Sequence, residues 1–208
     1  MHTLTRLLRF VSKKLGQKTA IHSVRRIQFP TSLLSNSTAP LSVYVLRDLS
    51  AYLKRYGFTS ADYFQLGSEA QQDLQTMPLL GPLKKSKSIL EVHESIFTEH
   101  FSSFDQHCNY RILRADADSL EFSALSTGES SQALLESPKS SHLGCIQKAG
   151  VAAALGTLIS HPLSEVRHPR CVYLGDPECL FEVRFAPKNR GKVRPLSPIQ
   201  RLGLPPAG

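Results

Sequence analysis

Three cysteines and one histidine in the last third of the chain are the residues best suited to chemistry. They are Cys145, His168, Cys171 and Cys179. Cys145 opens a run of small residues that is typical of a buried helix, whereas Cys171 and Cys179 flank Gly175-Asp176-Pro177-Glu178, a strong hairpin signal. A hairpin brings the last two sulfurs together, and a helix packed over that hairpin adds the third.

Such a set of side chains suits a tetrahedral zinc site, which takes four soft or borderline ligands such as three thiolates and one imidazole. Glu165 is an alternative fourth ligand. The spacing matches none of the short zinc-ribbon patterns. Three other interpretations therefore stay open: buried cysteines without a metal, an iron–sulfur cluster, and a disulfide, which needs an oxidising compartment. Cys108 is expected to be a free, buried thiol.

The formal charge of +8 is unevenly distributed along the chain. Residues 1 to 47 hold eight Lys or Arg and no carboxylate, and residues 185 to 208 hold five more, again without a carboxylate. The stretch between them holds 17 acidic against 12 basic residues, a net charge of −5. This argues against a nucleic-acid-binding core, because phosphate binding needs cationic side chains clustered on the folded surface. Only the basic arms remain candidates for binding nucleic acid or another anionic partner.

The N-terminal arm, residues 1 to 44, is amphipathic, basic and rich in hydroxyl side chains, which is typical of an organelle transit peptide. Its arginine content favours a mitochondrial over a plastid peptide, and basic residues interrupt any apolar run of a secretory signal. On this interpretation the protein lies in the mitochondrial matrix, and otherwise in the cytoplasm. A disordered or partner-docking tail and a membrane-surface helix are the alternatives.

The rest of the chain predicts one domain over residues 45 to 186 and a disordered, basic, Pro-rich tail over residues 187 to 208. The apolar periodicity indicates long helices and short strands, hence an α+β fold in which helices pack on an antiparallel sheet. No apolar run is long enough to span a membrane. The expected elements are helices Ser88–Phe104 and Leu143–Ile159, shorter helices near 49–57 and 63–77, strands 110–113, 120–125, 165–174 and 179–185, and an exposed loop over 126–141.

The segment from Gly144 to Phe185 resembles the C-terminal part of the vinyl-4-reductase domain family. That family includes the sensor modules of phenol- and toluene-responsive bacterial activators and relatives in tetrapyrrole metabolism. In the sensor modules a Cys begins a small-residue helix, a Gly lies five residues on, and two more Cys follow after 25 and then seven intervening residues. Cys145, Gly150, Cys171 and Cys179 stand in that register, with His168 where the sensors have a carboxylate ligand.

The resemblance implies a fold shared at a distance with the transport-protein-particle subunits, with a terminal β-hairpin zinc site and a ligand pocket between helices and sheet. The candidate pocket residues lie on the apolar side of the helix expected at Ser88–Phe104: His93, Ile96, Phe97, His100 and Phe101. The sensor relatives hold a phenolic ligand with a His and a Trp. This chain has no Trp, so phenol recognition of that kind is not carried over.

The sequence favours a non-catalytic function, because it has no Gly-rich phosphate loop, no His-Glu-x-x-His motif and no nucleophile elbow. A zinc closed by four protein ligands also leaves no position for a reactive water. We therefore expect a zinc-stabilised domain that binds a small apolar or aromatic ligand, or acts as a sensor, adaptor or assembly factor. It would signal through a protein partner, or through a homodimer formed by the small-residue helix. The alternative is an enzyme or carrier of tetrapyrrole metabolism.

Overall fold

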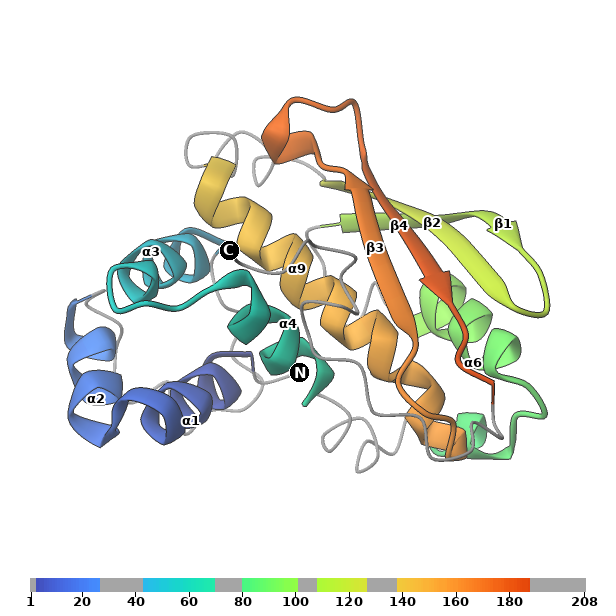
Figure 1. The fold of residues 1–208 in the computed structure, drawn as a ribbon, viewed down its shortest axis with the longest axis horizontal. Coiled ribbons are helices and arrows are strands. Elements are labelled where there is room, and N and C mark those ends of the chain that lie inside the picture. Colours follow the sequence, from blue (N-terminus) through green and yellow to red (C-terminus); the bar gives the residue numbers. More distant parts are fainter. Residues whose placement is uncertain (1–2, 27–42, 70–79, 101–107, 127–137, 188–208) are drawn as a thin grey trace.

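The computed structural model describes residues 3–26, 43–69, 80–100, 108–126 and 138–187 and has an α+β fold (Figure 1). Its first half is helical, its second half alternates strands and helices, and most of the expected elements are confirmed. The elements are α1 (Thr3–Leu15), α2 (Gln17–Arg26), α3 (Val43–Lys54), α4 (Ser60–Ser68), the 3-10 turn η3 (Pro82–Lys85), α6 (Ile89–Ser95), the π-helical turn η4 (Ile96–His100), β1 (Cys108–Ala115), β2 (Ser119–Ser126), α9 (Pro138–Ala154), the 3-10 turn η5 (Leu155–Ile159), β3 (Glu165–Arg170), η6 (Val172–Leu174) and β4 (Cys179–Arg184).

Several of the expected boundaries are wrong. The helix expected near 49–57 is α3, which begins at Val43 and ends at Lys54. Three other boundaries differ for a local reason. The strand expected over 165–174 ends at Arg170, because the backbone turns at Cys171, whose carbonyl accepts a bond of 2.8 Å from the Leu174 N–H. Helix α9 begins at Pro138, so the end of the expected loop is helical. Helix α4 begins before residue 63, because Thr59 and Asp62 form a capping box at its N-terminus.

Other expectations fall on residues outside the described part of the chain. These are the tail over 188–208, the end of the helix expected at Ser88–Phe104, and residues 70–77 of the helix expected after Tyr63.

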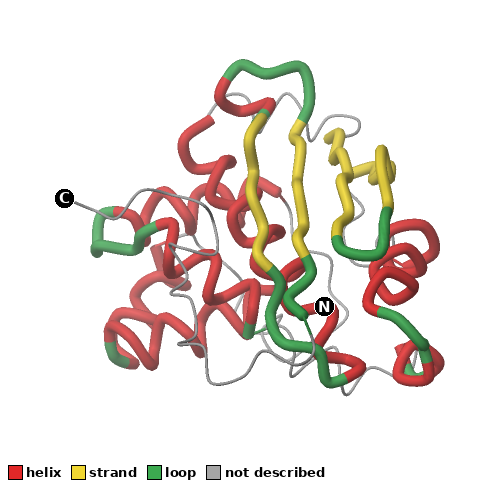
Figure 2. Tube along the Cα trace, turned by 45° about the vertical axis from the view of Figure 1, so that its right-hand side comes forward, coloured by secondary structure: helices red, strands yellow, loops and turns green. Residues whose placement is uncertain are grey.

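The four strands form one antiparallel sheet in the order β1-β2-β4-β3. Alternate side chains of the two central strands are buried, as expected for a sheet with one face against the core. In the view of Figure 2 the strands lie in front of most of the helices. The buried residues of this face are Leu120, Phe122 and Ala124 on β2 and Cys179, Phe181 and Val183 on β4.

Helix α9 lies between the sheet on one side and α3 and α4 on the other (Figure 1). By length and composition one window among the described residues, His142–Ile159, passes as a candidate membrane span, with a mean hydropathy of 1.2. Of that window 67% is buried inside the fold. The apolar character of this helix is thus explained by its place in the core.

The small residues of α9 allow α4 to cross it at backbone contact. A Cβ atom added to Gly150 would overlap the carbonyl oxygen of Phe64 on α4, and one added to Gly67 would overlap the carbonyl oxygen of Gln147. Glycine at both positions lets the two helix axes approach more closely than any side chain permits. The face of α9 around Gly150 is therefore covered by α4 and is not available for the homodimer expected there.

The described part of the N-terminal arm is folded against the domain. Leu7, Phe10 and Val11 of α1 belong to the hydrophobic core, and the Phe10 ring meets Phe58 edge-on at a centroid distance of 5.9 Å. Lys14 also forms an ion pair with the buried Asp62 carboxylate. The folded unit thus extends past the expected boundary at residue 45. The targeting role of the arm, and with it the mitochondrial location, stays a prediction.

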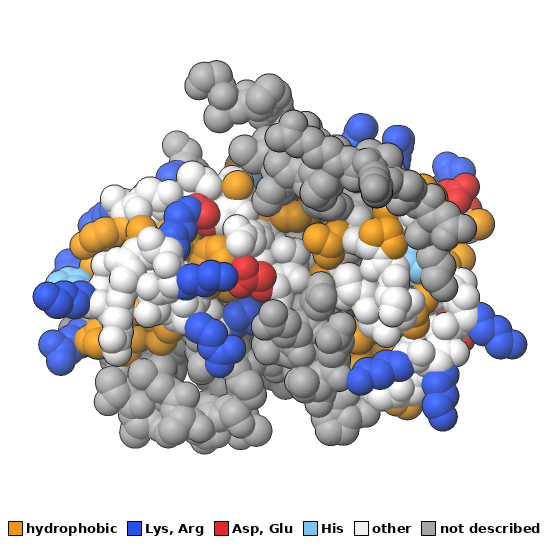
Figure 3. Space-filling model, turned by 60° about the horizontal axis from the view of Figure 1, so that its bottom comes forward, with side chains coloured by type: hydrophobic (Ala, Val, Ile, Leu, Met, Phe, Trp, Pro, Cys, Tyr) orange, Lys and Arg blue, Asp and Glu red, His pale blue; other side chains and the backbone are white. Residues whose placement is uncertain are grey.

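Most of the basic side chains in the described part of this arm face outward, whereas Arg6 is buried. Figure 3 shows Lys and Arg side chains at the end of the molecule formed by the N-terminal helices. These charges are compatible with the packed apolar face because the two sets occupy opposite sides of amphipathic helices. The exposed basic residues are Arg9, Lys13, Lys14, Lys18, Arg25 and Arg26.

We predict that Gly150→Ala destabilises the protein by about 1–3 kcal/mol or more, because the new methyl group meets backbone that cannot move without separating α4 from α9. Gly144→Ala in the same helix is the matched control. No heavy atom lies within 4 Å of its added Cβ, so it should stabilise the protein by up to about 1 kcal/mol. Urea unfolding of both variants measures the difference, and equal effects would contradict the close crossing.

Candidate metal-binding site

Four side chains that the sequence singled out converge beside the N-terminal half of α9. Cys145 lies on this helix, His168 on β3, Cys171 directly after β3, and Cys179 is the first residue of β4. Their ligand atoms, three sulfurs and one imidazole nitrogen, all lie within 4.8 Å of one another. Glu165 pairs with Arg184 in the ladder between β3 and β4 and does not belong to this group. The cluster could therefore hold a metal ion, with His168 as the fourth ligand.

A bulge in β3 aims two of these residues at the same point. In a regular strand His168 and Cys171, three positions apart, would face opposite sides of the sheet. The register between β3 and β4 shifts by one residue between Arg167 and Arg170, and Pro169, which has no N–H for the ladder, lies inside the shift. The extra residue reverses the alternation. His168 and the buried Cys171 can then approach the same cluster.

The distances within the cluster exclude a disulfide in this structure. The Cys145 and Cys179 sulfurs are 3.6 Å apart, and the Cys179 and Cys171 sulfurs 3.9 Å, against about 2.0 Å for a disulfide bond. All three cysteines are free and buried. Both ring nitrogens of His168 are also buried without a hydrogen bond to nitrogen or oxygen. Its polar neighbour is the Cys179 thiol, whose pKa the imidazole helps to lower. Since a buried imidazole normally has partners, His168 is the group in this cluster that most needs a ligand.

The three thiols influence one another's ionisation. Hydrogen bonds with Cys145 and Cys171 strongly lower the pKa of Cys179, because two neighbouring S–H groups stabilise its thiolate. Hydrogen bonds with Cys171 and Cys179, together with burial, raise the pKa of Cys145. Without a cation the cluster thus favours one thiolate among three sulfurs. A metal ion would supply the positive charge needed to remove the other protons.

The hairpin after β3 holds its cysteine through backbone bonds. The Cys171 N–H donates to the Asp176 carboxylate at 2.7 Å, and the Asp176 N–H donates to the Cys171 carbonyl at 3.2 Å. Gly175 adopts a φ of 105°, in the left-handed region that favours glycine. Arg170 and Glu178 form an ion pair of 3.3 Å between the two sides of the turn. These contacts confirm the expected turn and place Cys171 near Cys179.

The structure adds one residue that the sequence analysis missed. His142 lies one turn before Cys145 on α9, and its Nδ1 is 3.3 Å from the Cys171 sulfur. Its ring stacks on His168 with centroids 5.5 Å apart and planes at 16°. Burial and the nearby His168 lower the pKa of His142. The His-x-x-Cys spacing on a helix was the available signal, because residues three apart share a helix face.

The expected ligand-pocket residues are mostly core residues. Ile96 and Phe97 are buried, and the Phe97 ring stacks on Phe122 of the sheet at a centroid distance of 4.0 Å. His100 is half-buried beside Glu99, and Phe101 lies outside the described residues. The role of these side chains in ligand binding stays a prediction.

His93 is fully buried, and both of its ring nitrogens face backbone carbonyls. Nδ1 lies 2.8 Å from the Ile89 oxygen and Nε2 3.0 Å from the Ala152 oxygen of α9. Burial is the main cause that lowers the pKa of His93 to about 4, with a contribution from nearby His161. This imidazole connects α6 to α9. In this arrangement it has no nitrogen left for a ligand.

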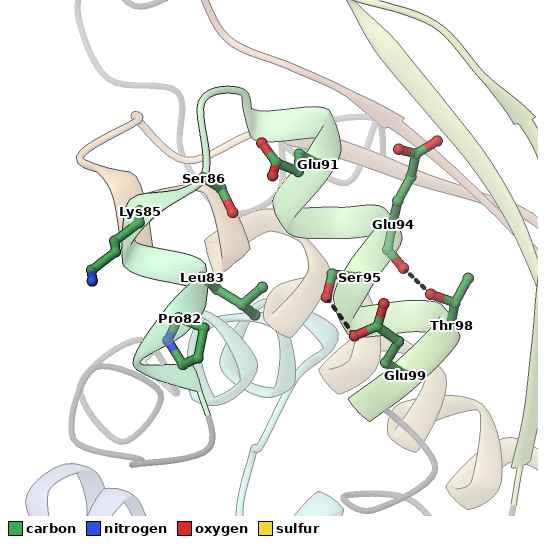
Figure 4. Close-up of a pocket in the computed structure, with 9 residues that line it drawn as sticks. All are labelled: Pro82, Leu83, Lys85, Ser86, Glu91, Glu94, Ser95, Thr98 and Glu99. Carbon is green, nitrogen blue, oxygen red and sulfur yellow. Dashed lines mark hydrogen bonds between the residues drawn. The ribbon is translucent and has the colours of Figure 1, made fainter.

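A surface hollow of about 470 Å³ does lie beside α6, on the side away from the sheet (Figure 4). Figure 4 shows Leu83 from η3 and the side chains of Glu91, Glu94 and Glu99 at this hollow. Its lining mixes apolar surface with polar side chains, three of which are glutamates. It therefore differs from the apolar pocket expected on the opposite face of the same helix.

Cys108 lies at the start of β1, away from the four-residue cluster. It forms no disulfide and is buried, as expected, and its sulfur lies 2.8 Å from the Lys148 ammonium nitrogen.

Comparison with known proteins identifies similar folds but assigns the chain to no family. No family model matches the chain, and no curated protein matches its sequence. Among solved structures, an H-NOX protein from Shewanella oneidensis in the Fe(II) ligation state gives a TM-score of 0.64 at 11% identity, over 91% of this chain and 98% of the other.

Two further structures agree with the fold that the resemblance implied. The phenol-responsive sensory domain of the transcription activator PoxR, solved with phenol, has a TM-score of 0.53 at 13% identity, over 71% of this chain and 76% of that one. A trafficking protein particle complex subunit 3 from Naegleria fowleri, covalently bound to palmitic acid, has a TM-score of 0.51 at 13% identity, over 72% and 98%. At these identities the likeness shows a shared fold. Among the similar proteins, this fold occurs in a sensory domain and in a subunit of a complex.

The buried His93 should make the free energy of unfolding fall as the pH is lowered. Its pKa is about 4 when folded and about 6.5 when unfolded, so the unfolded chain binds more protons between these values. We predict that the free energy of unfolding of the wild type falls by about 2–3 kcal/mol from pH 7 to pH 4.5 because of His93. This contribution should be absent in His93→Gln. Denaturant unfolding at both pH values measures this. His22→Gln, at an exposed histidine, should keep the wild-type dependence, and an unchanged slope in His93→Gln would contradict the prediction.

Proposed function

We propose that this protein is a non-catalytic ligand-binding or protein-interaction domain of the vinyl-4-reductase type, with a structural zinc held by Cys145, His168, Cys171 and Cys179. The observation that carries the zinc is the convergence of three buried sulfurs and one imidazole, whose nitrogens have no hydrogen bond to nitrogen or oxygen, within 4.8 Å of one another. The centre would attach the N-terminal end of α9 to the hairpin between β3 and β4.

The geometry of the four side chains fits zinc. Zinc–sulfur bonds of about 2.3 Å in a tetrahedron place the sulfurs roughly 3.8 Å apart. The two sulfur–sulfur distances of 3.6 and 3.9 Å lie on either side of that value. Three thiolates and one imidazole are a ligand set that zinc prefers over magnesium or calcium, which take oxygen ligands. With all four positions taken by protein, the centre supports structure and leaves no place for a reacting water.

The sensor or assembly role is supported by the fold and by the lack of catalytic motifs. The similar structures include a sensory domain that binds phenol, an Fe(II) protein and a subunit of a trafficking complex. We propose that this chain likewise binds a small apolar or aromatic ligand, or a protein partner, and acts on other chains through that binding. The partner surface would lie outside the α4-covered face of α9.

The second candidate, a tetrapyrrole carrier, is favoured by one observation. The H-NOX structures cover 89–94% of this chain, against 71% for the sensory domain. One of these structures comes from work on heme distortion in the H-NOX family. The described side chains fit a heme poorly, however. Both nitrogens of the buried His93 face backbone carbonyls, of which the neutral ring donates to one, and Ile96 and Phe97 are packed in the core. His100 is the remaining imidazole on this helix.

The zinc proposal predicts one zinc ion per chain in the protein purified without added metal, and less than half of that in Cys171→Ser, which loses one of four ligands. Cys108→Ser is the matched control and should keep its zinc, because Cys108 lies outside the cluster. Elemental analysis of the three proteins measures the ratio. Full zinc in Cys171→Ser, or none in the wild type, would contradict the proposal.

The two candidate functions separate in a heme titration. We predict that adding hemin to the full chain gives no shifted Soret band and no rise in thermal stability, because the described α6 side chains are already packed. A stoichiometric band that His100→Ala abolishes would instead support the tetrapyrrole carrier.

A further inference from the structure

His142 touches two of the four side chains of the zinc centre without belonging to it. Its Nδ1 approaches the Cys171 sulfur at 3.3 Å, and its ring covers one face of the His168 imidazole. The His168 ring also stacks on Phe181, with planes within 15° and a centroid distance of 4.4 Å. His168 therefore makes stacking contacts with both an imidazole and a phenyl ring.

The net charge of the proposed zinc centre indicates what the contact between His142 and Cys171 would do. Three thiolates and one neutral imidazole around a zinc dication leave the centre with a net charge of −1. Hydrogen bonds to ligand sulfurs stabilise such excess charge and are part of what tunes a metal site. In the tautomer that is protonated at Nδ1, His142 has an N–H within hydrogen-bonding range of a sulfur that would be a thiolate.

We infer that His142 is a positioning residue of the zinc centre, with two contacts that act on different ligands. Its N–H donates to the Cys171 thiolate, and its ring fixes the plane of His168 so that a ring nitrogen stays directed at the metal. This inference rests on the zinc centre proposed above. It assigns to α9 a second residue of the centre, one turn before Cys145.

Two substitutions separate the two contacts. His142→Phe keeps a flat ring to stack on His168 and removes the N–H, whereas His142→Asn places an amide N–H near the position of Nδ1 and removes the stack. Loss of partners that orient metal ligands typically lowers metal affinity about 10–100-fold. We expect a loss of that size in His142→Phe and a smaller loss in His142→Asn. His22→Ala, at an exposed histidine of α2, is the control and should bind zinc as the wild type does.

The affinities are measured on the full chain by competition for Zn²⁺ with a chromogenic chelator. Substitution with Co²⁺ supplies the second readout, since its visible spectrum reports the ligand set. The spectrum should keep its three-sulfur, one-nitrogen character in both His142 variants and lose it in His168→Ala. Wild-type affinity in His142→Phe would overturn the inference. So would a His142→Phe spectrum like that of His168→Ala, which would make His142 a ligand. A wild-type protein that binds no Zn²⁺ would instead overturn the zinc centre itself.

Discussion

The close packing of α9 is the constraint on which the rest of the structure depends. Its middle turn meets α4 at a crossing that only glycine permits, at Gly67 and Gly150. Near its C-terminal end the carbonyl of Ala152 contacts His93 of α6. Its N-terminal half carries His142 and Cys145 to the hairpin between β3 and β4. One helix thus connects the N-terminal helices, the α6 segment and the metal-binding cluster.

The cluster is also continuous with the hydrophobic core on the inner face of the sheet. A column of stacked rings runs from His168 through Phe181 and Phe122 to Phe97, with centroid distances of 4.4, 4.8 and 4.0 Å. Aromatic pairs of this kind contribute about 0.5–1.5 kcal/mol each beyond the area they bury. The imidazole that would bind the metal is therefore part of the core packing, and a metal there would stabilise the same unit that buries α9.

Much of the site follows from the sequence because its signals are local. The turn residues from Gly175 to Glu178 predict the hairpin, and the small residues after Cys145 predict a buried helix, so the convergence of three sulfurs can be expected from the residues alone. His168, three residues before Cys171, was the expected fourth ligand on residue type, and the resemblance places it where the sensors have a carboxylate ligand. The four side chains do meet, although the bulge at Pro169 that lets His168 and Cys171 face one way depends on the neighbouring strand and has no signature in the sequence.

The parts that the sequence did not reveal depend on tertiary contacts. The basic leader has the composition of a transit peptide, yet Phe10 and Val11 pack in the core, because an amphipathic helix that can bind a membrane or a receptor can equally bind a protein core. His93 has the spacing of a pocket residue, but its polar atoms are used by backbone of α6 and α9. Burial on one helix face does not distinguish a pocket from a packed core.

The central claim, a closed zinc centre at the end of α9, is tested most directly by X-ray absorption at the zinc edge of the protein as purified. A closed centre predicts three sulfurs at about 2.3 Å and one nitrogen at about 2.0 Å around the zinc, which are the usual lengths of zinc bonds to cysteine and histidine. A zinc surrounded by nitrogen and oxygen alone, or a protein that contains no zinc to measure, would contradict it.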